Sequence, residues 1–323
     1  MKRIEQIDWL KGFCIILVVI GHFYSYQFTE LNTHYLYNLI YTFHMPLFMF
    51  ISGFLSNPLD TKKLIKKLSY FLCPVLFVGI PMSIVFHHTS IDSFWLKPLK
   101  YGYWYLWTLS FFYIFMRLKK TVDDHFSHSE KSIDFIFFTS ILISAYLFKM
   151  SIPKQIGDII SIDQFCTYWP FFYGGYVIKK YSLYTYITQS NALFSFCFIS
   201  YLPFIYLYFH GCSIKFIVGS CAIVSLIYLF NRLDNQKISD QLSYLGKNTL
   251  DIYIFHHLFI EAINVKDICA WISETSNILF EIVFLLIISI FISYCSALWG
   301  KLLKQSKFVE NIVYGKFIDY FIK

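Results

Sequence analysis

Long apolar stretches recur along the chain, and most have the length of a membrane-spanning helix. An α-helix rises about 1.5 Å per residue, so about 20 residues cross the roughly 30 Å of hydrocarbon in a bilayer. The apolar stretches lie at about 9–27, 35–56, 68–88, 101–118, 133–150, 165–178, 188–209, 213–230, 243–262 and 277–300. A membrane β-barrel would show shorter segments of alternating hydrophobicity instead. The sequence therefore predicts an all-α polytopic membrane helix bundle with about ten transmembrane helices.

The composition excludes an ordinary soluble domain. Of the 323 residues, 57% are hydrophobic and only 15% are charged, a balance that requires lipid as the solvent. The connections between the apolar stretches are short, so any chemistry must come from residues within the bundle or at its edges. The eight cysteines lie mostly inside apolar stretches, without CxxC pairs or the spacing of metal ligands. We expect them to be packing residues, and we expect no metal.

The basic residues indicate how the chain crosses the membrane. With ten spans and a cytoplasmic N-terminus, 21 of the 27 lysines and arginines fall on the cytoplasmic side. This asymmetry satisfies the positive-inside rule, so both termini are predicted to be cytoplasmic. The net charge of +7 then reports topology, and we expect no nucleic-acid partner. The first apolar stretch has no small-residue cleavage site after it, so it is expected to be a retained helix.

Residues 305–323 differ from the transmembrane domain that is predicted for residues 1–304. Apolar residues recur there at helical spacing between charged ones: Val309, Ile312, Val313, Phe317 and Tyr320. This pattern predicts an amphipathic tail that lies on the cytoplasmic surface of the membrane. A packed tail without a special role is the alternative.

The first apolar stretch carries polar residues that are costly inside a membrane. Asp8 and Lys11 are three residues apart and can pair on one helical face. His22 follows Lys11 by eleven positions, roughly 1100° of helix and so within about 20° of three full turns. Lys11 and His22 thus share a face, roughly 16 Å apart along the axis. This spacing suits a ligand with an anionic end near Lys11 and a reacting group near His22. An interfacial anchor and a packed histidine are the alternatives.

A second polar cluster lies in the stretch Phe43–Phe54, which contains His44 and Ser52. Pro46 removes a backbone donor, so the helix is expected to kink there, and Gly53 allows another helix to approach closely. A kinked helix that carries His44 suits the wall of a cavity. An ordinary proline-kinked packing helix is the alternative.

Two later stretches add aromatic and polar residues. Trp104, Tyr105 and Trp107 open the fourth span, where an interfacial aromatic belt is the alternative to a binding role. The ninth span contains Tyr253 and His256, which would then lie within the membrane. Polar residues at that depth are functional candidates because hydrocarbon penalises them.

These stretches resemble the signature segments of the acyltransferase 3 family of membrane acyltransferases, especially its fucose 4-O-acetylase-like branch. The segment Ile7–His22 resembles the family's first-helix signature, a basic residue and a histidine with ten positions between them. Phe43–Phe54 resembles the second-helix motif, and Trp104–Leu109 and Leu245–His256 resemble later ones. The four segments occur in the family's order and extend over essentially the whole chain. Lys11 departs from the arginine of many members: it keeps the charge but loses the bidentate contact with phosphate.

The resemblance implies transfer of an acyl group, usually acetyl from cytoplasmic acetyl-CoA, to a sugar hydroxyl. The expected partners are acyl-CoA, an envelope glycan or lipid-linked saccharide, and the lipid of a bacterial inner membrane. No bound cofactor is needed, since acetyl-CoA is a substrate. His22 would be a general base or a transient acyl carrier, with His44 as a second catalytic candidate. Lys11, oriented by Asp8, would meet the CoA phosphates. The candidates for orienting donor, acceptor or oxyanion are Ser52, Trp104, Tyr105, Trp107, Tyr253 and His256.

A protein that is not an enzyme is the main alternative. A small transporter or a flippase of a lipid-linked sugar also has about ten helices, polar residues within the membrane and proline kinks. Such a protein would bind its substrate without consuming acetyl-CoA. A glycan polymerase is a third candidate, although it would be expected to have a larger extracytoplasmic loop.

Overall fold

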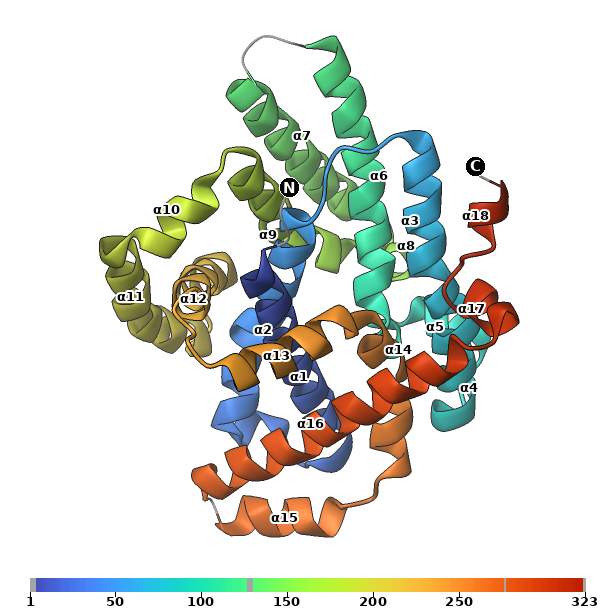
Figure 1. Ribbon diagram of the computed structural model, residues 1–323, viewed down its shortest axis with the longest axis vertical. Helices are drawn as coiled ribbons and strands as arrows, with labels where there is room; N and C mark the ends of the chain where they lie inside the picture. The colour runs from blue at the N-terminus through green and yellow to red at the C-terminus, as the bar shows by residue number, and fades with distance from the viewer. Residues whose placement is uncertain (1–3, 127–129, 276, 322–323) are drawn as a thin grey trace. The chain divides into compact units, whose positions relative to one another are not determined.

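The computed structural model describes residues 4–126, 130–275 and 277–321 of the chain. Helices joined by short connections make up these ranges, and no strand occurs within them (Figure 1). The predicted all-α membrane fold is confirmed.

Each of the ten predicted spans coincides with helical structure. The long helices are α1 (Glu5–Gln27), α2 (Tyr35–Phe54), α3 (Thr61–Pro74) with α4 (Ile80–His87), α6 (Trp104–His125), α7 (Glu130–Ser151), α9 (Ile162–Lys180), α11 (Asn191–Phe209), α12 (Lys215–Phe230), α14 (Thr249–Ala262) and α16 (Ile278–Leu303). Among the described residues, five segments are long and apolar enough to cross a membrane: Glu5–Gln27, Thr61–His87, Lys131–Ser151, Asn191–Phe209 and Ile278–Leu303. Membrane crossing by the other five predicted spans stays a prediction.

Shorter helices connect the long ones. They are α5 (Ile91–Leu96), α8 (Lys154–Ile160), α10 (Leu183–Gln189), α13 (Gln236–Lys247), α15 (Lys266–Thr275), α17 (Lys307–Val313) and α18 (Ile318–Phe321). The segment Val75–Gly79 is a π-helical turn that joins α3 to α4.

The chain divides into two compact units. The first unit comprises residues 1–51 and 178–301, and the second unit comprises residues 52–177 and 302–323. The C-terminal helices α17 and α18 therefore belong to the second unit, where both contact α3.

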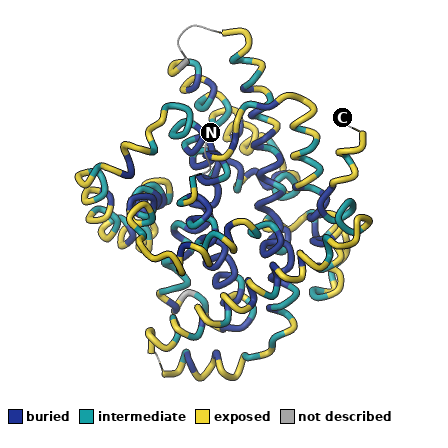
Figure 2. Tube along the Cα trace, in the orientation of Figure 1, coloured by how far each residue is buried: buried dark blue, intermediate teal, exposed yellow. Residues whose placement is uncertain are grey.

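Helix α1 is the core of the first unit. In its most apolar window 78% of the residues are buried, against 11% in α11 and 22% in α16, whose exposed apolar side chains suit contact with lipid (Figure 2). Gly12 lies so close to α13 that a Cβ atom would overlap the Leu242 carbonyl group. A Cβ atom at Gly246 of α13 would likewise overlap the carbonyl group of Asp8. The two glycines thus allow α1 and α13 to pack backbone against backbone, as small residues do in membrane helix pairs.

The ninth predicted span, 243–262, is interrupted. Helix α13 ends at Lys247, Asn248 has φ −103° and ψ 16°, and α14 begins at Thr249. The Asn248 side chain donates a hydrogen bond of 2.8 Å to the Tyr244 carbonyl oxygen. Asparagine competes in this way with the helical backbone and satisfies a carbonyl group at the helix end. The prediction of one continuous span was based on hydropathy averaged over residues 243–262. Such an average is insensitive to a single hydrogen bond, so it did not show the break at Asn248.

Aromatic side chains fill the second unit. Phe112 of α6 contacts Phe165, Trp169 and Phe172 of α9, with ring centroids 5.1, 5.4 and 4.9 Å away. The end of α2 reaches α9 at Gly53, where a Cβ atom would overlap the Phe172 carbonyl group. The predicted close helix approach at Gly53 is confirmed.

A buried ion pair joins α6 to α7 in the second unit. The Lys119 ammonium group lies 2.7 Å from the Asp134 carboxylate and also pairs with Asp123. Lys119 is completely buried and Asp134 is 3% exposed. The Tyr173 hydroxyl group of α9 donates a hydrogen bond to Asp134. In the sequence Lys119 is only one of the predicted cytoplasmic cations, whereas in the structure it is the centre of a buried network.

We predict that Gly53→Ala destabilises the protein, because the added methyl group overlaps the Phe172 carbonyl group and overpacking costs about 1–3 kcal/mol. The matched control is Gly174→Ala in α9, where a Cβ atom has nothing within 4 Å and alanine is the better helix former. The apparent melting temperature of the detergent-solubilised chain reports on both variants. Equal melting temperatures would contradict the close contact.

Asp134→Ala is expected to lower the free energy of unfolding by up to about 3–5 kcal/mol, because it leaves the buried Lys119 with only the partly exposed Asp123. The double variant Lys119→Leu, Asp134→Leu removes both charges and should recover most of the loss. Asp60→Ala, which removes only exposed ion pairs, is the control. Thermal unfolding in detergent measures all three, and a loss no larger than that of the control would refute the buried pair.

Candidate functional site

Three histidine rings meet in the first unit. His22 comes from α1, and His256 and His257 come from α14, which packs against α1. The ring centroid of His22 is 5.1 Å from that of His256 and 4.6 Å from that of His257. The rings of His256 and His257 are 4.1 Å apart. We call these three residues the histidine cluster.

His22 is the accessible member of the histidine cluster. The structure describes every residue from Cys14 to Tyr24, and all of them are buried except His22, which is partly exposed. His256 is completely buried and His257 is 5% exposed. Of the three rings, only His22 keeps appreciable surface for contact with a further group.

The backbone selects the tautomer of two histidines. Nδ1 of His256 lies 2.9 Å from the Ile252 carbonyl oxygen, and Nδ1 of His44 lies 2.7 Å from the Ile40 carbonyl oxygen. A carbonyl oxygen can only accept, so Nδ1 carries the proton, and Nε2 of the neutral ring keeps a lone pair. Nε2 of His256 is buried and has no hydrogen-bond partner among the described residues. Because an unsatisfied buried nitrogen is costly, this atom marks a place for a polar ligand.

The histidine cluster also has the composition of a metal site. One nitrogen atom from each ring lies within 4.8 Å of those of the other two. Three histidines with an open fourth position form the ligand set of some catalytic zinc sites. The same lone pairs can instead take a proton from a hydroxyl group.

The predicted ion pair at the start of α1 is present. Lys11 Nζ lies 3.6 Å from Asp8 Oδ1, and the two side chains are 20% and 9% exposed. Helix α1 is uninterrupted from Glu5 to Gln27, so Lys11 and His22 keep the predicted axial separation of roughly 16 Å. One helix therefore carries a cation near its N-terminus and an accessible histidine near its other end.

His44 is linked to the turn of α1 that carries His22 by the side chain of Tyr41, which contacts both. The His44 ring centroid is 4.8 Å from that of Tyr41, one turn earlier on α2. A Cβ atom at Gly21, the neighbour of His22, would lie 3.1 Å from the Tyr41 ring. Tyr41 therefore contacts both His44 and the turn of α1 that carries His22. Tyr253, another predicted site residue of this unit, is buried, with its ring 6.2 Å from that of His256.

The remaining predicted site residues lie in the second unit, where the structure brings two of them together. The Ser52 and Tyr105 hydroxyl groups are hydrogen-bonded at 2.6 Å. Trp104 stacks on Tyr168 with a centroid distance of 5.0 Å. The indole N–H of Trp107 donates to the Ile159 carbonyl oxygen at 3.0 Å, so this donor already has a structural role.

Two features of the first unit were not predicted from the sequence. His257 directly follows the candidate His256, and that adjacency was its only signal. Glu281 accepts a hydrogen bond from the Tyr24 hydroxyl group, and the same oxygen lies 2.8 Å from Nδ1 of His34. The signal for this network was present, since Glu281 is the one charged residue of the apolar stretch 277–300.

The chain belongs to the acyltransferase 3 family, because the family's sequence profile, described as an acyltransferase domain, matches residues 4–298. It is an integral membrane protein of that family. Two relatives are both named nodulation protein NolL. The chain is 28% identical to that of Mesorhizobium japonicum over 137 residues, and 31% identical to that of Sinorhizobium fredii over 121 residues. These matches cover 37% and 32% of each chain, so the protein spans about a third of the length of these relatives. No solved structure matches the chain.

Proposed function

We propose that the protein is an O-acyltransferase, and specifically an O-acetyltransferase, of the fucose 4-O-acetylase-like branch. It moves an acyl group from cytoplasmic acyl-CoA to a sugar hydroxyl of an envelope glycan or lipid-linked saccharide at the bacterial inner membrane. The observation that carries this proposal is the histidine cluster, in which the partly exposed His22 contacts His256 and His257 of α14. The chain that contains this cluster belongs to the acyltransferase 3 family.

His22 is the proposed catalytic residue. A neutral imidazole at this position accepts the proton of the sugar hydroxyl, and the oxygen attacks the thioester carbonyl carbon. The C–S bond then breaks, and the departing CoA sulfur takes the proton from His22. In the second form of the mechanism His22 itself attacks the thioester carbonyl carbon, the C–S bond breaks, and CoA leaves as a thiolate. The sugar oxygen then attacks the acyl group, the bond between the acyl carbon and His22 breaks, and the hydroxyl proton passes through the imidazole to the CoA sulfur. His256 and His257 orient the His22 ring, and Nε2 of His256 can accept a hydrogen bond from a substrate.

Lys11 is the proposed contact for the CoA phosphates, and Asp8, 3.6 Å away, orients its ammonium group. The roughly 16 Å between Lys11 and His22 allows one extended donor to present phosphates at one end and its thioester at the other. In this proposal acyl-CoA enters as a substrate and free CoA leaves as a product, and the enzyme binds no cofactor.

Further residues of the first unit are proposed to contact the acceptor. His44 is the second catalytic candidate, and Tyr253 lies on α14, the helix of His256 and His257. In the second unit, the proposed substrate contacts are the hydroxyl pair of Ser52 and Tyr105 and the rings of Trp104 and Trp107. The apolar face of a sugar ring can pack against such aromatic rings.

We predict that His22→Ala lowers acyl transfer by about 10²–10⁴-fold, the range expected when a general acid–base group is lost. Membranes with equal amounts of wild type, His22→Ala or the exposed control His210→Ala are incubated with labelled acetyl-CoA and glycolipid, and label in saccharide is measured. The His210 variant should retain activity. Full activity of His22→Ala would remove His22 from the mechanism. No transfer by the wild type, over a range of acyl donors and acceptors, would favour the transporter or flippase instead.

Lys11→Ala is expected to raise KM for acetyl-CoA by about 10-fold or more, because a hydrogen bond to a charged group contributes about 1.5–3 kcal/mol. Lys11→Arg keeps the charge and should stay close to wild type. Lys237→Ala, which removes an exposed lysine of α13, is the control for net charge. A KM that is equal for Lys11→Ala and the control would place the CoA phosphates elsewhere.

A further inference from the structure

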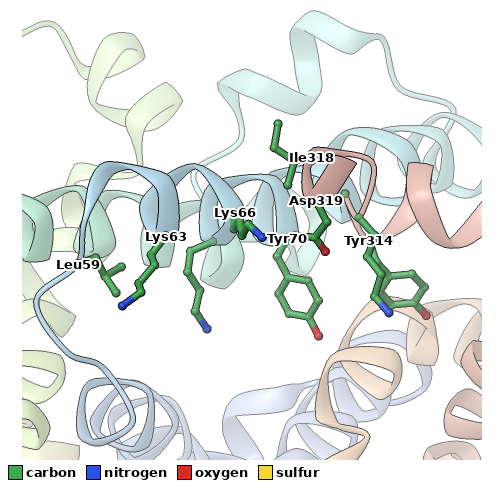
Figure 3. A pocket seen from close by; sticks show the side chains of 10 residues that line it. Leu59, Lys63, Lys66, Tyr70, Tyr314, Ile318 and Asp319 are labelled. Atoms are coloured by element: carbon green, nitrogen blue, oxygen red, sulfur yellow. Dashed lines mark ion pairs between the residues drawn. The ribbon is translucent and has the colours of Figure 1, made fainter. Parts of the chain in front are cut away.

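A pocket of about 500 Å³ opens in the second unit, between α3 and the C-terminal segment of α17 and α18 (Figure 3). Its charged lining residues are Lys63, Lys66, Lys67, Lys316 and Asp319. In Figure 3, Lys63 and Tyr70 point to the same side of α3, and Asp319 lies beside Lys66. We call this site the lysine pocket. Four cations and one carboxylate line the pocket, and Lys316 also pairs with Glu310 outside the lining, so the net charge of the site stays positive.

The lysines of α3 are placed where they repel one another. Lys66 and Lys67 follow Lys63 by three and four residues, so both are neighbours of Lys63 on the helix surface. Like charges at this spacing destabilise a helix. An anion bound between them would remove that repulsion.

The charges within the protein only partly compensate these lysines. Asp319 lies 2.8 Å from Lys66, and Asp60 lies 3.8 Å from Lys63 with both side chains at least half exposed. Lys67 contacts the rings of Phe71 and Tyr113 and has no carboxylate partner among the described residues. A cation without a counter-ion, next to a cavity, is a position for an anionic ligand.

The C-terminal wall of the lysine pocket is held in place by a specific backbone contact. Gly315 has φ +66°, and a Cβ atom there would overlap Ser69 of α3. The Ser69 hydroxyl group donates a hydrogen bond of 2.8 Å to the Gly315 carbonyl oxygen. Only glycine meets both requirements, the left-handed backbone and the close approach. The contact between Ser69 and Gly315 therefore fixes the C-terminal wall of the pocket against α3.

The same C-terminal segment exposes aromatic side chains. Phe308, Tyr320 and Phe321 are 73%, 65% and 80% exposed. Exposed aromatic residues beside lysines are typical of segments at the headgroup level of a membrane. At the headgroup level of a membrane, both lipid phosphates and dissolved phosphates are available.

We propose that the lysine pocket binds a phosphate-bearing anion, with Lys63 and Lys67 as its main contacts and Asp319 as the internal counter-ion that the ligand displaces. Lysine ammonium groups bind phosphate as point charges, and Tyr70 offers a hydroxyl donor. The phosphate comes either from an anionic lipid headgroup or from a soluble phosphate compound. This site is independent of the proposed acyl transfer.

The test is a binding experiment on the full-length protein in nanodiscs of neutral phosphatidylcholine. The two probes are phosphatidylglycerol, titrated into the nanodiscs, and inorganic pyrophosphate in solution. Lys63→Gln, Lys67→Gln as a double variant is expected to weaken binding of at least one probe by about tenfold or more. The matched control is Lys62→Gln, Lys307→Gln, which removes two exposed lysines outside the pocket and should bind like wild type. The probe that responds identifies the source of the phosphate.

Asp319→Asn is expected to change the affinity for the probe in the opposite direction, and it serves as a second test. Removing the carboxylate frees Lys66, so binding of the responding probe should tighten severalfold. If the double lysine variant fails to fold, Asp319→Asn decides alone. Equal binding by the lysine variant and its control, or binding to Asp319→Asn that is no tighter than to wild type, would overturn the proposal.

Discussion

Hydrocarbon offers no hydrogen-bond partner, so a polar group that a membrane helix turns inward must find its partner within the protein. The structure follows this constraint where charges are buried, since Lys119 meets Asp134 and Glu281 meets Tyr24. Such pairs fix which helices are neighbours, because parting the two groups would leave a charge without compensation. Nε2 of His256 is one of several buried side-chain atoms that lack a hydrogen-bond partner among the described residues. In the proposed function a substrate group supplies the bond that this atom lacks.

The same environment explains the role of glycine in this fold. Between helices in lipid there is little hydrophobic driving force, so association depends on close van der Waals packing. Gly12 and Gly246 bring α1 and α13 into backbone contact, and Gly53 does the same for α2 and α9. The first contact has a functional consequence. This contact packs the turn of α1 that carries Asp8 and Lys11 against α13. The residues proposed to bind the CoA phosphates therefore lie on a closely packed helix pair.

The helical period was enough to predict which residues of one helix lie on the same face. The shared face of Lys11 and His22 and the pair of Asp8 with Lys11 follow from spacing, and the ion pair is present in the structure. Period says nothing about a neighbouring helix, so the contact of His22 with His257 could not be predicted. Trp107 shows the same limit of the sequence pattern. Its indole N–H donates to the Ile159 carbonyl oxygen, a partner that no local pattern reveals.

By itself the sequence determined that the protein is an all-α membrane protein, where most helices lie, and which four segments resemble the acyltransferase 3 family. These properties are local, because apolar length and helical period act within one segment. Only the tertiary structure decided that the three histidines meet, that Lys119 is buried, and that the C-terminal segment closes the lysine pocket over α3. These outcomes depend on which helix faces pack together, and that choice is made by complementary shape and paired polar groups between residues far apart in the chain.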